Sequence, residues 1–249
     1  MNDPNGVVHR DGRTHVFFQY SRDPDWLIRE WGHAVTIDLV HWEYLPIALS
    51  PTPGTADEWG VWSGSIVVDD VGTGHAFYSG LSAAPGPQPP MHAVSNSPVL
   101  AMWSKDIGGN PVVAGFPDGI GAHTMRDPSV RRTSSGWEML VGAGLDGGVP
   151  AVLRYVSDDL HSWRFVDLFA SGDRGVLNGK WTGSVWECPQ AIAKGETTLL
   201  TVSLFDPVAH HDTAYMGVIH HALWVTGREG RAGFDPGECG VLDRGYFYA

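Results

Sequence analysis

Asn2-Asp3-Pro4-Asn5-Gly6 is followed at once by two apolar runs, Val7-Val8 and Val16-Phe17-Phe18, which flank the pair Asp11-Gly12. An Asp-Gly pair between short apolar runs is a strong signal for a tight β-hairpin. The stretch therefore predicts a hairpin over Gly6–Tyr20 that begins directly after a polar motif carrying an acid.

The same arrangement occurs three more times along the chain. The later polar motifs are Trp62-Ser63-Gly64-Ser65, Arg126-Asp127-Pro128 and Trp186-Glu187-Cys188-Pro189, and the hairpins expected after them are Ser65–Tyr78, Ser129–Val141 and Gln190–Leu204. The steps from Asp3 to Ser63, to Asp127 and to Glu187 are 60, 64 and 60 residues. Such a period indicates a repeat architecture in which equivalent positions approach one axis.

Four-stranded units with this spacing predict an all-β, five-bladed β-propeller whose innermost strands begin at a central funnel. The 249 residues suit a single catalytic domain over 1–249, with blades near 1–60, 61–124, 125–184 and 185–241. The next step of the repeat falls near Phe247, so the fifth blade is expected to begin at 242–249 and to be incomplete.

A second element is repeated in the outer part of two units. Asp38–Tyr44 and Asp159–Phe165 share the pattern Asp-Leu-x-x-Trp-x-aromatic. We expect a structural role, in which the acid caps a turn and the tryptophan packs between blades.

Composition excludes several classes of function. The formal net charge is −12 and no run of Lys or Arg occurs, which argues against nucleic acid and anionic membrane as partners. No stretch has the apolar length of a transmembrane helix. The pairs His210-His211 and His220-His221 lack the spaced partners of a metal-binding motif, so neither a metal nor another cofactor is expected.

Carboxyl groups gathered in one pocket with aromatic and amide neighbours are the equipment for cleaving a glycosidic bond. One acid protonates the leaving oxygen, while a second, ionised one attacks the anomeric carbon or activates water. Propeller funnels also hold binding sites without chemistry, so the residues alone leave both functions open.

The ordered motifs together resemble glycoside hydrolase family 32, the β-fructofuranosidase family of invertases, inulinases, levanases and sucrose-6-phosphate hydrolases. Besides the four polar motifs, the segments that carry the resemblance are Phe17–Tyr20, Trp31–Ala34, Asp38–Glu43, Leu45–Leu49 and Leu242–Ala249. The resemblance implies cleavage of terminal β-D-fructofuranosyl linkages in sucrose or fructans. It also implies a member truncated before its C-terminal β-sandwich.

The resemblance further implies a role for each site residue. Asp3 matches the nucleophile of a retaining double displacement, Glu187 matches the general acid/base, and Asp127 with Arg126 matches the pair that binds fructose hydroxyls and stabilises the transition state. In a retaining pair the carboxyl groups lie about 5 to 5.5 Å apart. The fructosyl contacts fall on Asn2, Gln19, Trp26 and Ser63, while Trp62 stands where a Phe is more frequent.

Three other functions compete with this interpretation. A fructosyltransferase would pass the same covalent intermediate to a sugar instead of water. A truncated fragment or sugar-binding propeller would be catalytically silent. An inverting arabinosidase or xylosidase shares the fold, but the motifs at Asp3 and Glu187 argue against it. The absence of a leader predicts a cytoplasmic protein if the start is genuine and a secreted one if an upstream segment is missing.

Overall fold

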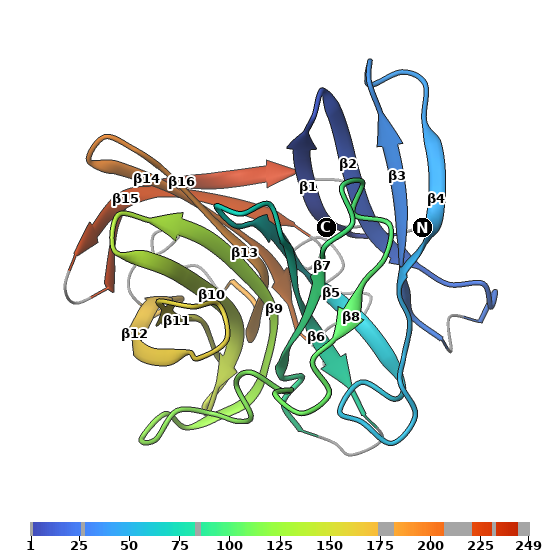
Figure 1. The fold of residues 1–249 in the computed structure, drawn as a ribbon. Coiled ribbons are helices and arrows are strands. Elements are labelled where there is room, and N and C mark those ends of the chain that lie inside the picture. Colours follow the sequence, from blue (N-terminus) through green and yellow to red (C-terminus); the bar gives the residue numbers. More distant parts are fainter. Residues whose placement is uncertain are drawn as a thin grey trace. The chain divides into compact units, whose positions relative to one another are not determined.

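The computed structural model describes residues 2–25, 28–82, 86–173, 182–206, 221–230 and 233–243. Within these residues β-strands are the only regular elements, and they form four sheets of four strands each (Figure 1). The predicted all-β class is therefore confirmed. No helix in the described part of the chain has the length and apolar character needed to cross a membrane.

Each sheet follows the chain in order, so that every strand pairs with the next one. This meander of four antiparallel strands is the topology of a β-propeller blade. The first sheet holds β1 (Pro4–Arg10), β2 (Arg13–Tyr20), β3 (Glu30–Thr36) and β4 (Glu43–Leu49), and the second holds β5 (Gly60–Val68), β6 (Gly74–Leu81), β7 (Pro90–Ser95) and β8 (Ser104–Lys105). The third holds β9 (Ala122–Thr133), β10 (Gly136–Leu145), β11 (Val149–Ser157) and β12 (Arg164–Ser171), and the fourth holds β13 (Val185–Lys194), β14 (Thr197–Phe205), β15 (Ala222–Gly230) and β16 (Gly233–Asp243).

The four predicted hairpins are confirmed as β1–β2, β5–β6, β9–β10 and β13–β14. In the first of them Asp11 and Gly12 both have positive φ, 49° and 73°. A two-residue turn with both φ values positive matches the right-handed twist of the flanking strands.

The structure differs from the sequence expectation at the end of the chain. Leu242 and Asp243, where a fifth blade was expected to begin, complete β16 in the fourth sheet, and Asp243 pairs with Ala222. The spacing of motifs reports where first strands begin, whereas two register shifts between β15 and β16 lengthen this outer hairpin. Residues 244–249 lie outside the described residues.

The chain divides into two compact units. The first comprises Met1–Gly115, Asp127–Trp137 and Ser157–Trp163, and the second comprises Phe116–Arg126, Glu138–Val156 and Arg164–Ala249. The core of the first unit packs residues of the first two sheets together. Its fully buried members include Phe17, Trp31, Val61 and Tyr78 in strands and Leu100 in the segment between β7 and β8.

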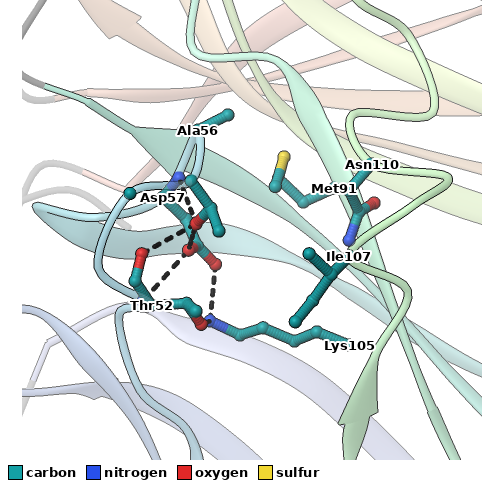
Figure 2. A pocket seen from close by; sticks show the side chains of 9 residues that line it. Thr52, Ala56, Asp57, Met91, Lys105, Ile107 and Asn110 are labelled. Carbon is teal, nitrogen blue, oxygen red and sulfur yellow. Dashed lines mark hydrogen bonds and ion pairs between the residues drawn. The ribbon is translucent and has the colours of Figure 1, made fainter.

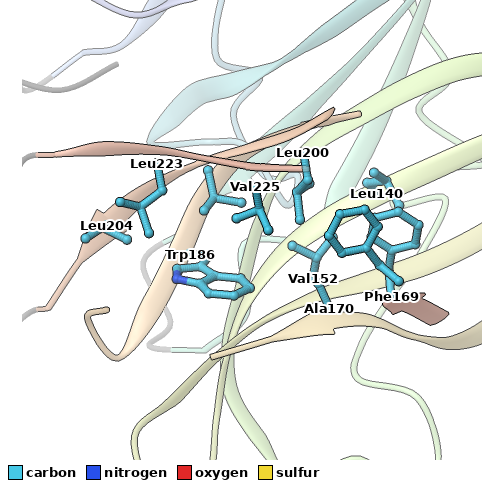
Figure 3. Packing of buried hydrophobic residues seen from close by; sticks show 11 residues of the cluster. Leu140, Val152, Phe169, Ala170, Trp186, Leu200, Leu204, Leu223 and Val225 are labelled. Carbon is cyan, nitrogen blue, oxygen red and sulfur yellow. The ribbon is translucent and has the colours of Figure 1, made fainter. Parts of the chain in front are cut away.

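The core of the second unit centres on a fully buried tryptophan of β13, Trp186 (Figure 3). Aliphatic residues of β14 and β15, including Leu200 and Leu223, pack with it in one cluster. Gly142 lies against the same motif, because a Cβ atom there would clash with the carbonyl oxygen of Trp186. The polar motif at Glu187 thus follows directly on a core residue.

Two pairs of buried histidines occupy equivalent places in the first two sheets. Nδ1 of His15 lies 3.0 Å from Nε2 of His33, and Nδ1 of His75 lies 3.0 Å from Nε2 of His92. Burial, with the neighbouring imidazole as a second cause, lowers the pKa of His33 and of His92 from 6.5 to about 3. Both pairs are therefore neutral in the folded protein near neutral pH.

The repeated Asp-Leu-x-x-Trp element has the predicted structural role in full only in its second copy, because Asp38 of the first copy caps its turn but Trp42 is 42% exposed. Oδ1 of Asp159 accepts hydrogen bonds from the backbone N–H groups of His161 and Ser162, at 2.8 and 2.7 Å. The ring of Trp163 meets that of Phe77 edge to face, with centroids 5.4 Å apart. The acid therefore caps the turn, and the tryptophan packs on the second sheet.

A buried ion pair joins the segment before β5 to the last strand of the second sheet. The carboxylate of Asp57, which is 0% exposed, accepts a bond of 2.5 Å from Nζ of Lys105 and one of 2.8 Å from the hydroxyl of Tyr78. Figure 2 shows the Lys105 ammonium pointing at this carboxylate. Burial lowers the pKa of Lys105, whereas the bond to Asp57 opposes this shift.

Candidate active site

Asp3 stands immediately before β1, at a place where the strand is irregular. The register of β1 against β2 shifts between Pro4 and Gly6. The backbone around Asp3 is fixed across the hairpin, because the N–H of Asn2 donates to the carbonyl of Gln19 and the N–H of Gln19 donates to the carbonyl of Asp3, both at 2.9 Å. A bulge at this point redirects the following side chains, as bulges next to functional sites commonly do.

The side chain of Asp3 joins a small hydrogen-bond network in the first unit. Oγ of Ser63 donates to Oδ2 of Asp3 at 2.7 Å, and Nε2 of Gln19 donates to Oγ of Ser63 at 2.8 Å. With its amide oriented so that both ends find partners, Asn5 donates to the same hydroxyl at 3.2 Å. Three of the predicted site residues, Asp3, Gln19 and Ser63, are thus in direct contact.

Burial raises the pKa of the Asp3 carboxyl, and the hydrogen bond from Ser63 lowers it. The two effects oppose one another because burial penalises the ionised form, whereas a donated hydrogen bond stabilises it. The Ser63 hydroxyl is therefore an element that favours the ionised carboxylate a nucleophile requires.

Asp127 lies in β9 in a left-handed backbone conformation, with φ at 59°. A residue other than glycine rarely adopts this conformation, which costs about 1 to 3 kcal/mol unless the surroundings enforce it. The N–H of Asp127 donates to Oγ of Ser79 at 2.7 Å, and the same Oγ lies 3.3 Å from Oδ1 of the Asp127 carboxylate. Both acids of the first unit therefore contact a serine hydroxyl.

In the second unit a guanidinium holds the third acid. Nη1 of Arg126 donates to Oε1 of Glu187 at 3.0 Å, while its Nη2 donates to Oγ1 of Thr124 at 3.0 Å. The guanidinium also lies over the ring of Phe205, 5.5 Å from its centroid. Glu187 is 8% exposed, so this ion pair is largely shielded from solvent.

Glu187 stands at another irregular point of a first strand. The register of β13 against β14 shifts between Glu187 and Gln190, and Cys188 has a positive φ of 48°. The register of β5 against β6 shifts in the same way between Val61 and Gly64, around Ser63. Distorted first strands are therefore shared by the motifs at Asp3, Ser63 and Glu187.

Of the remaining predicted site residues, the structure describes Trp62 and Asn2 but not Trp26. The guanidinium of Arg29 lies over the ring of Trp62, with its central carbon 5.3 Å from the ring centroid. The backbone carbonyl of Trp62 accepts a hydrogen bond of 2.9 Å from Nε1 of Trp31. Asn2 is exposed beside Asp3. Trp26 lies outside the described residues. In the part of the chain that the structure describes, no group of three or more His, Cys, Asp and Glu side chains is placed to hold a metal ion.

Sequence reasoning missed Asn5 and Ser79 as site residues, although a signal for Ser79 exists. Gln19 follows Asp3 by sixteen residues, Ser79 follows Ser63 by sixteen, and Ser203 follows Glu187 by sixteen. This offset places a polar residue on the second strand opposite three of the four motifs, as the pairing of Glu187 with Ser203 demonstrates.

Four propeller-type blades that carry polar motifs at distorted points of their first strands define an all-β protein of the propeller class. A model of the glycosyl hydrolases family 32 N-terminal domain matches residues 1–249, the whole chain. The chain belongs to glycosyl hydrolase family 32, as the sequence motifs predicted.

Curated relatives carry three kinds of name. A sucrose-6-phosphate hydrolase of Salmonella typhimurium is 34% identical over all of this chain and 52% of the relative. An acid beta-fructofuranosidase 1, vacuolar, of a Rosa hybrid cultivar is 32% identical over all of this chain and 43% of the relative. A levanase of Bacillus subtilis (strain 168) is 37% identical over 76% of this chain and 26% of the relative. The chain spans about half the length of the first of these relatives.

Solved structures agree in fold. A GH32 beta-fructofuranosidase of Bombyx mori matches with a TM-score of 0.77 and 26% identity over 98% of this chain and 50% of that chain, and a mutant of it was solved in complex with sucrose. Fructan 1-exohydrolase IIa of Cichorium intybus matches with a TM-score of 0.74 and 26% identity over 95% of this chain and 44% of that chain.

Proposed function

We propose that this protein is a glycosidase that cleaves terminal β-D-fructofuranosyl linkages of sucrose or fructans. Its family membership and the names of its relatives support this substrate class. The acidic net charge of −12 suits a neutral sugar better than a polyanion.

The proposed reaction is a double displacement with retention. Asp3 attacks the anomeric carbon of the fructosyl unit while Glu187 protonates the leaving oxygen, and Glu187 then takes a proton from the water that releases fructose. The bond from Ser63 to Asp3 supports the first role, because it favours an ionised nucleophile.

Arg126 and Asp127 are proposed to bind fructose hydroxyls and to stabilise the positive charge that develops on the ring. Asn2, Gln19, Trp26, Trp62 and Ser63 are proposed to complete the fructosyl site. The contact of Arg126 with Glu187 supports a shared site for these two residues, since the guanidinium is held within reach of the acid. The observation that carries the proposal is the Asp3–Ser63–Gln19 network at the distorted start of β1.

The experiment is product analysis with the full-length protein on sucrose, inulin and levan. We expect free fructose from at least one of them, with the first-formed anomer retaining the β configuration by NMR. The variants Asp3→Asn and Glu187→Gln are expected to lose about 10⁴-fold or more in kcat. Asp11→Asn is the matched control, because Asn-Gly also suits the exposed turn that Asp11 occupies.

Two outcomes would redirect the proposal. Glucose in excess over free fructose from concentrated sucrose would identify a fructosyltransferase. An Asp3→Asn variant as active as wild type would remove the nucleophile assignment.

We also propose that the four sheets are blades of one catalytic propeller domain over 1–249, with blades near 1–60, 61–124, 125–184 and 185–241, and that a fifth blade follows them. The identical strand order of the sheets supports this proposal. Because β16 extends to Asp243, we propose that the fifth blade begins after that residue, and not at Leu242. A crystal structure of the full-length protein tests this arrangement.

A further inference from the structure

Ser79 lies fully buried in β6 and contacts Asp127 twice. Its Oγ accepts a hydrogen bond of 2.7 Å from the backbone N–H of Asp127 and lies 3.3 Å from Oδ1 of the same residue. It also donates to the carbonyl oxygen of Ser63 at 3.0 Å. One hydroxyl therefore links the distorted segment of β5 to both the backbone and the carboxylate of Asp127.

We propose that Ser79 is a positioning residue that sets the orientation of the Asp127 carboxylate, a role that rests on the proposed function. Asp127 has a left-handed φ of 59°, which an L residue keeps only where surrounding bonds enforce it. The bond to Ser79 is made at the N–H of this same residue, so its loss releases the peptide that aims the carboxylate.

The repeat explains why this support reaches a neighbouring sheet. Gln19 of β2 donates to Ser63 of β5, and Ser79 of β6 accepts from Asp127 of β9, so that a second strand supports the first strand of the following sheet. The corresponding residue of β10 is Ala143, whose side chain has no polar atom, and its neighbour Gly142 lets the backbone approach Glu187, with a Cβ there 3.3 Å from the Glu187 Cα. The position equivalent to Ser79 in the third sheet therefore offers Glu187 no side-chain hydroxyl.

The chain supplies a matched control in β5, the strand that pairs with β6. Oγ of Ser65 accepts a bond of 2.9 Å from the N–H of Val130 and donates one of 3.0 Å to the carbonyl of Pro128. Ser65 and Ser79 thus join β9 to the second sheet by equivalent pairs of bonds, but the partners of Ser65 are backbone groups without a carboxylate.

The test compares Ser79→Ala, Ser79→Thr and Ser65→Ala in the full-length protein. We expect Ser79→Ala to lower kcat on the cleaved fructoside by about 10- to 100-fold, because misplacing a catalytic group by an ångström has an effect of this order. The KM of Ser79→Ala should change far less than its kcat. Ser79→Thr should recover most of kcat because it keeps the hydroxyl. Ser65→Ala should lower the melting temperature as much as Ser79→Ala does, while its kcat stays at the wild-type value. Equal kcat values in Ser79→Ala and Ser65→Ala would overturn the proposal.

A second measurement does not depend on activity. Amide hydrogen exchange followed by NMR should accelerate at Asp127 in Ser79→Ala and at Val130 in Ser65→Ala. If the wild-type protein cleaves no fructoside, the proposed function fails, while unchanged exchange at Asp127 in Ser79→Ala would overturn the positioning role whatever the activity.

Discussion

Ser63 donates a hydrogen bond of 2.7 Å to Oδ2 of Asp3, although sixty residues separate them in the sequence. The bond joins the residue that precedes β1 to β5 of the next sheet, and the register is irregular beside both residues. Since the hydroxyl stabilises the ionised carboxylate that burial disfavours, Ser63 controls the ionisation of the proposed nucleophile in addition to its predicted contact with the fructosyl unit.

Removing this hydroxyl should shift the pH dependence of activity. In Ser63→Ala the pKa of Asp3 rises further, so the ionised form is lost at a higher pH as the solution is acidified. The low-pH limb of kcat/KM should therefore move to higher pH, because the ionised nucleophile loses a hydrogen bond that stabilises it. Profiles for wild type, Ser63→Ala and Ser65→Ala test this, and an unshifted limb in Ser63→Ala would count against it.

The ion pair between Lys105 and Asp57 should be essential to stability. Lys105→Met leaves a fully buried carboxylate without its cation, and breaking a buried pair in this way costs about 3 to 5 kcal/mol. Chemical denaturation of the variant measures this loss in the free energy of unfolding. Lys194→Met, at an exposed end of β13, is the control and should stay within about 0.5 kcal/mol of wild type.

The Asp57→Asn/Lys105→Met double variant should recover part of that loss, because no uncompensated charge remains in the buried site. A single Lys105→Met variant as stable as the Lys194→Met control would show that the pair contributes nothing.

Gly64 should tolerate no larger residue. A Cβ at this position would overlap the carbonyl oxygen of Phe77 on the paired strand, so the backbone that carries Ser63 must move. We expect Gly64→Ala to cost about 3 kcal/mol or more and to lower activity together with stability. At Gly115 a Cβ would meet no atom within 4 Å, which makes Gly115→Ala the control. A melting temperature equal to that of the control would contradict the prediction.

The buried histidine pairs should make the protein sensitive to acid. The pKa of His33 and of His92 is about 3 in the folded protein, below the ordinary 6.5, so the unfolded chain binds more protons between these values. Their stabilising contribution is complete above pH 6.5 and is lost as the pH falls toward 3, by about 1.4 kcal/mol per pH unit for each histidine.

Denaturant unfolding between pH 8 and pH 5 measures this slope, in a range where most carboxylates stay ionised. The double variant His33→Gln/His92→Gln should flatten the profile, because the amide keeps a hydrogen-bonding group but does not titrate. A profile as steep as that of wild type would assign the acid sensitivity to other groups.

Much of the fold could be predicted because it is encoded locally. Asp11-Gly12 specifies its own turn, and Asp159 caps its turn through its own side chain, so the sequence needs no distant information for either. The end of β16 could not be predicted in the same way. The repeat counts the distance between first strands, while register shifts decide how far the outer strand continues past Leu242.

The site was predicted unevenly for a similar reason. Asp3, Asp127 and Glu187 occur in motifs that can be read along the chain. Ser79 acts through a contact between two sheets, and a lone serine in an apolar strand carries no motif of its own. Only the sixteen-residue offset from Ser63 marks it, and that offset acquires meaning once β5 and β6 are paired in register.

Each of the two capped turns contains a leucine in the left-handed backbone conformation, and the two leucines differ in burial. Leu39 and Leu160 both have left-handed φ values, 62° and 66°, but Leu39 is 66% exposed and Leu160 is 3% exposed. The same conformational strain is therefore accompanied by core packing at Leu160 and by little burial at Leu39. Asparagine or glycine at Leu39 should therefore increase the stability of the folded protein, because it relieves the backbone strain and removes little buried surface. The same exchange at Leu160 would remove a buried side chain from the core.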